Sequence, residues 1–228
     1  MNQDLDTSRT QSAYGRTSAL ATNSVIRNTY ILLSFTLLFS AGTAAWAMFT
    51  HARPLGILPV LIGTFGLLFL TTALRNSAWG LVSIFAFTGF MGYTLGPLLN
   101  FYIAHFSNGT ELVVYAMGST GAIFLGLSGY ALTTRKDFSY LRGFLFAGML
   151  IAIVAGIANI FLGIAGLALA MSTMIVVLMC GYILYQTSAL INGGETNYIM
   201  ATINLYMAIY NLFISLLQLL GAFAGNDR

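Results

Sequence analysis

Charged residues are scarce in this sequence. Its 228 residues include nine Lys and Arg and six Asp and Glu, which together make up 7% of the chain. Soluble domains carry about 25% charged residues, because a surface that faces water has to be solvated. The net charge of +3 reflects this scarcity of charge rather than a basic surface, so a nucleic-acid binder is excluded as well.

Cysteine is nearly absent too. Cys180 is the only one, and a single cysteine cannot form an internal disulfide framework. Hydrophobic residues, in contrast, make up 58% of the chain, and the mean hydropathy is +0.84. This composition excludes a soluble globular chain and a disordered one. It predicts an all-α polytopic membrane protein.

The residues needed for catalysis inside a membrane are also missing. His51 and His105 are the only histidines, and both fall between predicted spans, so no span offers a zinc-protease motif or a histidine base beside a serine. Calcium sites, proton relays and aspartyl proteases depend on carboxylates. All six carboxylates lie outside the predicted spans: Asp4, Asp6, Glu111, Asp137, Glu195 and Asp227. We therefore expect no enzyme activity, no catalytic residue, no metal site and no cofactor.

Seven apolar runs are long enough to cross a bilayer, which takes about 20 residues of helix. They fall at 28–50, 55–73, 79–103, 112–134, 142–162, 167–190 and 198–223. The fifth and sixth are separated only by the glycine-containing segment 162–166, where we expect a tight hairpin. The membrane domain is predicted at 28–224. A flexible tail rich in Ser, Thr and Asn is expected at 1–27, and a short C-terminal tail at 225–228.

The distribution of Lys and Arg predicts the orientation, because cytoplasmic loops are enriched in both. With a cytoplasmic N-terminus, seven of the nine cations lie on the cytoplasmic side: Arg9, Arg16, Arg27, Arg75, Arg135, Lys136 and Arg142. Arg53 and Arg228 lie on the other side. An odd number of spans then places the C-terminus in the periplasm.

Glycines recur at helical spacing in three of the predicted spans. They are Gly56, Gly63 and Gly66 in the second, Gly89, Gly92 and Gly96 in the third, and Gly118, Gly121, Gly126 and Gly129 in the fourth. Small residues let membrane helices approach closely. Close-packed helix interfaces are the favoured interpretation, and a small-residue wall along a pathway is the alternative.

Gly96-Pro97 lies inside the third span, where proline removes a backbone hydrogen bond and is expected to kink the helix. Asn100, one turn later, is a candidate to satisfy the freed carbonyl. A structural kink is the favoured interpretation, and a gate or an ion contact is the alternative.

The last span carries an amide side chain every seven residues: Asn197, Asn204, Asn211 and Gln218. Seven residues are nearly two helical turns, so these amides form one polar stripe, with Tyr206 and Tyr210 on the neighbouring face. An amide is costly to expose to lipid, so the stripe should face other helices, and Asn159 and Gln186 are candidate partners. Hydrogen bonding between helices is the favoured interpretation, and a hydrated conduit is the alternative.

Five short segments are spread over nearly the whole chain: Arg27–Tyr30, Phe85–Gly89, Gly96–Leu99, Leu132–Asp137 and Gly193–Tyr198. In their residues and their order they resemble the Bax inhibitor-1 family, and within it the bacterial YccA branch. The resemblance implies a seven-helix fold. It also implies a bacterial inner-membrane protein that binds the membrane AAA protease FtsH, which acts with HflK and HflC, and that restrains FtsH on other membrane proteins.

Other branches of that family are linked to a pH-sensitive calcium or proton leak, controlled by one aspartate in each of the last two helices. Matching the family's motifs onto Leu184–Thr187 and Leu205–Phe213 places Gln186 and Ala208 at these two positions. The family's arginine partner would fall near Arg75. A glutamine cannot titrate and an alanine cannot pair, so we expect the latch to be missing.

Three functions are then open: a modulator of an FtsH-type protease, an ion leak channel, and a structural assembly partner. The missing carboxylates disfavour the second. The tail favours the first over the third, since an AAA protease needs an unstructured handle, and 27 extended residues reach at most about 90 Å. An ordinary disordered terminus is the alternative for the tail.

Overall fold

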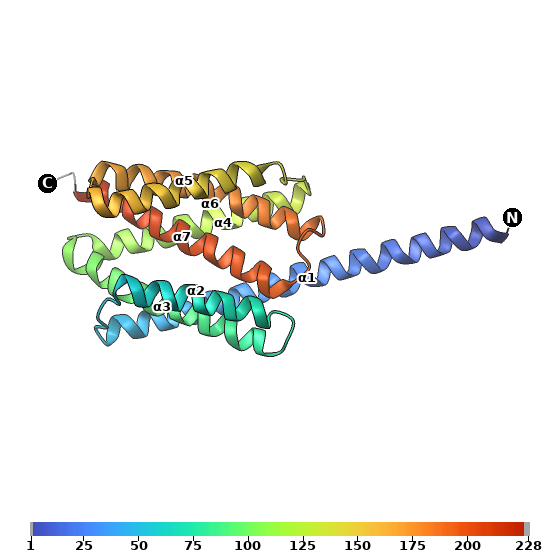
Figure 1. The fold of residues 1–228 in the computed structure, drawn as a ribbon, viewed down its shortest axis with the longest axis horizontal. Coiled ribbons are helices and arrows are strands. Elements are labelled where there is room, and N and C mark those ends of the chain that lie inside the picture. The colour runs from blue at the N-terminus through green and yellow to red at the C-terminus, as the bar shows by residue number, and fades with distance from the viewer. Residues whose placement is uncertain (1, 226–228) are drawn as a thin grey trace.

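The computed structural model describes the backbone of residues 2–225 and the side chains of residues 22–225 other than residue 165. This part of the chain folds into seven helices, which confirms the expected all-α fold (Figure 1). They are α1 (Asn2–Phe49), α2 (Ile57–Leu74), α3 (Trp79–His105), α4 (Gly109–Thr134), α5 (Leu141–Leu162), α6 (Ala165–Ile191) and α7 (Tyr198–Gly225). Each is long and apolar enough to cross a membrane.

Helix α1 is longer than the first apolar run. Residues 22–49 form a stretch long and apolar enough to cross a membrane, and the helix continues back to Asn2, beyond the bundle (Figure 1). Once a span has nucleated a helix, each added residue gains a hydrogen bond without a new nucleation cost, so even a polar sequence can extend it. The side chains of residues 2–21 lie outside the described part, and the flexibility expected for residues 1–27 stays a prediction.

The connection between α5 and α6 is the predicted hairpin. Gly163 ends α5 in the left-handed region at φ 62°, a conformation that a side chain would strain. Asn159 closes the turn, because its backbone oxygen accepts from Gly163 N and its side-chain Oδ1 accepts from Ile164 N at 3.1 Å. The expectation that Asn159 would pair with the amides of the last span is therefore wrong: its amide satisfies the end of its own helix.

Helix α7 forms the centre of the bundle. It crosses between the pair α2 and α3 on one side and the pair α5 and α6 on the other, and it packs against α1, α3, α4 and α6 (Figure 1). Its Leu205, Tyr206 and Leu212 are fully buried, and the Tyr206 ring meets Phe87 of α3 edge-on, with 6.1 Å between ring centroids. In lipid, such interlocking contacts rather than the hydrophobic effect hold helices together.

Helices α2 and α5 lie at the periphery. Along these two helices only Thr71 and Leu145, respectively, are buried. Large apolar side chains such as Phe69 and Phe161 are exposed on them, which in this chain means facing lipid. The deep core therefore belongs to the other five helices.

The glycines of α3 lie against α1, as predicted. A Cβ on Gly92 would overlap Ser40 and Thr43, and a Cβ on Gly96 would lie 2.5 Å from Ala47 Cβ and 2.9 Å from Ala44 O. Small residues thus allow these two backbones to approach closely.

The glycines of α4 do not follow this prediction. A Cβ on any of the four would have no atom within 4 Å: Gly118, Gly121, Gly126 and Gly129. The reason is that α4 buries another face, made by residues spaced one turn apart: Ala116, Thr120, Phe124 and Ser128. In α4, close packing was the wrong interpretation of the glycine spacing.

Pro97 lies inside α3, which continues without interruption from Trp79 to His105. Asn100 does not satisfy the carbonyl that Pro97 frees. Its Nδ2 donates instead to Met48 O, at 3.1 Å, near the end of α1. That expectation is wrong: the Asn100 side chain reaches Met48 O, which also accepts from His51 N at 3.1 Å, so the two bonds together hold the end of α1. A kink at Gly96-Pro97 stays a prediction.

Candidate functional site

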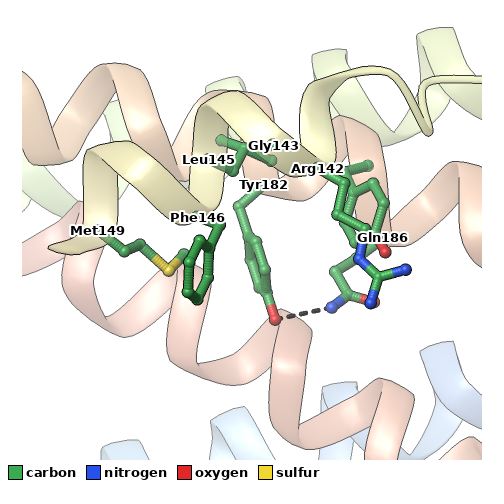
Figure 2. Close-up of a pocket in the computed structure, with 8 residues that line it drawn as sticks. Arg142, Gly143, Leu145, Phe146, Met149, Tyr182 and Gln186 are labelled. Atoms are coloured by element: carbon green, nitrogen blue, oxygen red, sulfur yellow. Dashed lines mark hydrogen bonds between the residues drawn. The ribbon is translucent and has the colours of Figure 1, made fainter.

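The position matched to the first family aspartate, Gln186, lies near the C-terminal end of α6 and is 7% exposed. Its Nε2 donates to the hydroxyl oxygen of Tyr182, one turn earlier, at 2.7 Å (Figure 2). The two side chains line a cavity of ≈ 640 Å³ between α5 and α6. Its wall is made by Arg142, Gly143, Leu145, Phe146, Met149, Tyr182, Tyr185 and Gln186.

The packing of α5 on α6 determines which residues reach Gln186. A Cβ on Gly181 would lie 3.1 Å from Leu145 Cδ2, and Leu178 lies against Gly148. These antiparallel contacts place Arg142, one turn before Leu145, alongside the turn of α6 that carries Gln186. Figure 2 shows both side chains projecting toward the same space.

Arg75 lies outside this cavity. Its side chain is exposed at the end of α2, and it is not among the residues that line the cavity. Its backbone oxygen accepts from Asn197 Nδ2 at 3.1 Å. A role of Arg75 as arginine partner stays a prediction, while the arginine that shares a cavity with Gln186 is Arg142.

The second family position, Ala208, lies in the core of α7 and is 1% exposed. A methyl group at this depth contributes packing and has no group to titrate or to bind an ion. Gln186 and Ala208 together therefore offer one neutral amide, already hydrogen-bonded, where a titratable pair of carboxylates would be needed.

The amides of the last span do not act as one stripe. Asn197 caps α7: its Oδ1 accepts from Ile199 N at 3.0 Å and from Met200 N at 3.1 Å. Its Nδ2 also donates to Asn76 Oδ1 at 2.9 Å, which ties the start of α7 to the loop between α2 and α3.

The other three amides differ from one another. Asn211 donates to Met207 O of its own helix at 2.8 Å. Gln218 accepts from Ser172 Oγ of α6 at 2.7 Å, and it is the only one of the three with a bond to another helix within residues 22–225. Asn204 is half-buried and has no side-chain hydrogen bond to the described residues. The predicted pairing with Gln186 is wrong: the Gln186 side chain bonds to Tyr182 of its own helix and to no amide of α7 within the described residues.

Hydroxyl groups make the polar contacts that the amides were expected to make. Tyr30 of α1 hydrogen-bonds to Ser128 of α4, and Thr187 of α6 lies 3.3 Å from Ser128 Oγ. Tyr206 of α7 is 2.6 Å from Ser40 Oγ of α1. The sequence singles out Tyr206 by its position beside the amides, but Ser and Thr also bond within their own helix, so their partners give no sequence signal.

A second cavity of ≈ 470 Å³ lies between α1, α3, α4 and α7. Tyr206, Tyr210 and Phe213 form part of its wall, opposite small residues such as Ala44 and Gly121. Across residues 22–225, no three His, Cys, Asp or Glu side chains lie together as metal ligands would. The chemistry that both cavities offer is that of neutral amides and phenols, with the guanidinium of Arg142 at the first.

Comparison with known proteins identifies the family of this chain. The sequence model of the family described as "Inhibitor of apoptosis-promoting Bax1" matches residues 22–225. The chain belongs to the Bax inhibitor-1 family.

Several curated members of the family are similar to this chain along nearly their whole length. The "Modulator of FtsH protease YccA" of Escherichia coli is 47% identical over 216 residues, which cover 95% of this chain and 97% of that protein. An uncharacterised protein of Pseudomonas aeruginosa is 54% identical over 204 residues, covering 89% and 91%. "Protein lifeguard 4" of the mouse is 32% identical over 206 residues, covering 86% and 84%.

These relatives confirm the resemblance to the Bax inhibitor-1 family and its YccA branch. An Escherichia coli relative carries the name "Inner membrane protein YccA", and this chain is likewise a multi-pass inner-membrane protein. The name of the first of these relatives describes a modulator of a protease rather than an enzyme. The family match begins at residue 22, within α1.

Proposed function

We propose that this protein binds the membrane AAA protease FtsH in the inner membrane and restrains its action on other membrane proteins. The observation that carries the proposal is the 47% identity, over 95% of this chain, to a protein named as a modulator of FtsH protease. Identity at this level over the full membrane domain preserves surfaces as well as the fold. HflK and HflC, which the family resemblance associates with FtsH, would belong to the same assembly.

The structure of the family's latch positions supports a modulator over a leak channel. Ala208 is packed in the core and Gln186 is hydrogen-bonded to Tyr182, so neither can change charge. A pH-sensitive leak needs a group inside the spans that does so. Within residues 22–225, the carboxylates Glu111, Asp137 and Glu195 lie at helix ends or in loops.

The N-terminal segment is the proposed handle for the protease. It precedes the family domain, and in the proposed orientation it lies in the cytoplasm, where the ATPase domain of an AAA protease works. The cations support this orientation. The α2–α3 connection, which contains Arg75, and the start of α5, which contains Arg142, lie at the end of the bundle from which α1 projects, and the α1–α2 connection, which contains Arg53, lies at the opposite end (Figure 1). As a helix, about 20 residues project roughly 30 Å from the bundle.

Affinity purification from membranes tests the binding. Tagged full-length protein and a variant that lacks residues 3–20 are isolated after mild cross-linking, and FtsH, HflK and HflC are quantified. We expect FtsH with both forms, because the spans remain. We expect slower FtsH-dependent turnover of the deletion variant, because the protease loses its starting point. Absence of FtsH from both preparations would contradict the proposed function, whereas equal turnover of the two forms would contradict only the handle.

A further inference from the structure

The cavity between α5 and α6 has one polar end and one apolar end. Arg142 belongs to the first turn of α5, at the edge of the membrane, and Tyr182 and Gln186 face it from α6 (Figure 2). Phe146 and Met149 continue the wall from there. Since a helix rises 1.5 Å per residue, Met149 lies about 10 Å deeper in the membrane than Arg142.

The polar end has donors without acceptors. Among the residues that the structure describes, the Arg142 guanidinium makes no ion pair and no hydrogen bond, and its side chain is exposed. The Tyr182 oxygen accepts from Gln186, so its own hydrogen is available to donate. The Gln186 amide has a second N–H that the bond to Tyr182 does not use. Three kinds of donor thus point into one space, and one of them carries a full positive charge.

The residues that line the cavity do not balance this charge. The lining of the cavity contains one cation and no acid. Glu195, in the connection between α6 and α7, lies near enough to act electrostatically on Tyr182, but it does not line the cavity, and its Oε1 accepts from Asn197 N at 2.8 Å at the start of α7. The loop that precedes α5 carries Arg135, Lys136 and Asp137, all exposed, and so adds a net charge of +1. The occupant that complements this end is an anion.

We propose that the cavity binds an anionic phospholipid of the surrounding membrane. The lipid phosphate accepts from the Arg142 guanidinium and from Tyr182 and Gln186, and one acyl chain follows the wall of Phe146 and Met149 toward the membrane centre. Basic pockets between transmembrane helices are typical sites for acidic headgroups. This inference concerns the membrane around the bundle and does not depend on the protease.

The surroundings of the cavity favour a lipid over a free phosphate ion. α5 is a peripheral helix, and Phe144, Phe146 and Leu150 are exposed on it to the bilayer. A ligand that enters from the side therefore has to cross an apolar surface. A phospholipid gains contacts along this surface in addition to those of its phosphate, and inorganic phosphate gains none.

Native mass spectrometry and thermal unfolding of the full-length protein test the site. The protein is purified in a mild non-ionic detergent, and phosphatidylglycerol or phosphatidylcholine with the same acyl chains is added. We expect wild-type protein to retain phosphatidylglycerol in preference and to unfold at a higher temperature with it. R142Q should weaken retention of phosphatidylglycerol roughly tenfold, because a charge-assisted contact is lost. Y182F should weaken it less, since it removes one neutral donor.

R135Q is the matched control, because it removes the same charge from the loop that precedes α5 and leaves the cavity wall unchanged. It should retain phosphatidylglycerol as wild type does. Equal retention of the two lipids by wild type, or undiminished retention by R142Q, would overturn the proposal. If R142Q fails to fold, the proposal is tested by two other comparisons: wild type should prefer phosphatidylglycerol to phosphatidylcholine, and Y182F should retain phosphatidylglycerol less well than wild type. Inorganic phosphate at millimolar concentration is the last arm: displacement of the lipid or equal stabilisation by it would make this a phosphate site and not a lipid site.

Discussion

Gln186 donates its side-chain N–H to the hydroxyl oxygen of Tyr182 at 2.7 Å, so the residue at the family's first aspartate position is held by its own helix. Its counterpart in α7, Ala208, is buried and has no polar group. Where leak branches of the Bax inhibitor-1 family have a titratable pair, this chain has a neutral amide that bonds to Tyr182 of its own helix, and a methyl group.

We expect the protein to lack a pH-sensitive calcium leak. In proteoliposomes, calcium flux through the wild-type protein is expected to be small and unchanged between about pH 6 and pH 8, because neither Gln186 nor Ala208, at the two family positions, carries a titratable group. A strong flux with a sigmoidal pH response would contradict the prediction. It would direct attention to Glu195 or Glu111.

Introducing an aspartate at either family position should lower the free energy of unfolding. A208D places a carboxylate in a fully packed position without a partner, and it is expected to destabilise the bundle by roughly 3–5 kcal/mol. Q186D is expected to cost less, because Arg142 lines the same cavity. Thermal unfolding in detergent compares the two variants. Equal stability of A208D and wild type would show that the core around Ala208 is looser than the structure indicates.

Two glycine substitutions separate packed from open positions. G92A drives a methyl group into Ser40 and Thr43 at the contact of α1 with α3, and overpacking of this kind costs about 1–3 kcal/mol. G126A is the matched control on α4, where a Cβ meets no atom within 4 Å, and it should be neutral or slightly stabilising. Detergent-induced unfolding measures both. Similar losses at the two positions would contradict the assignment of these helix faces.

The amides of α7 give a second matched pair. N197A removes two acceptor contacts at the start of α7 and two donor contacts to the loop between α2 and α3, and loss of a helix cap of this kind costs about 0.5–2 kcal/mol. N204A should have little effect on unfolding, because that side chain has no hydrogen bond to residues 22–225. A larger loss for N204A than for N197A would restore the idea of a continuous polar stripe.

Topology can be measured by cysteine labelling in intact cells. With Cys180 replaced by Ser, single cysteines at positions 10 and 226 report the two ends. Seven spans and the excess of cations at one end predict protection of the first position and labelling of the second by a membrane-impermeant reagent. Labelling of both positions would mean an even number of spans.

The seven helices could be predicted from the sequence because each apolar run is long and separated by charge or glycine. The contacts between helices could not. Hydropathy shows that an amide such as Asn159 must be satisfied in the membrane, but not that Ile164 of its own turn satisfies it. Equally, the register that brings Arg142 rather than Arg75 into the cavity of Gln186 is determined by Leu145 on Gly181 and Leu178 on Gly148. Such contacts are tertiary and leave no periodic signal.

The measurement that tests the central claim most directly is a chase of an unrelated FtsH substrate in the membrane. Its half-life is followed in cells without this protein, with the full-length protein and with the variant that lacks residues 3–20, each with active and inactive FtsH. We predict that the full-length protein lengthens the half-life when FtsH is active, and that the longer-lived variant lengthens it further. With inactive FtsH, neither form of the protein should change the half-life of the substrate. An unchanged half-life while the protein co-purifies with FtsH would contradict the account, because the protein would then bind the protease without restraining it.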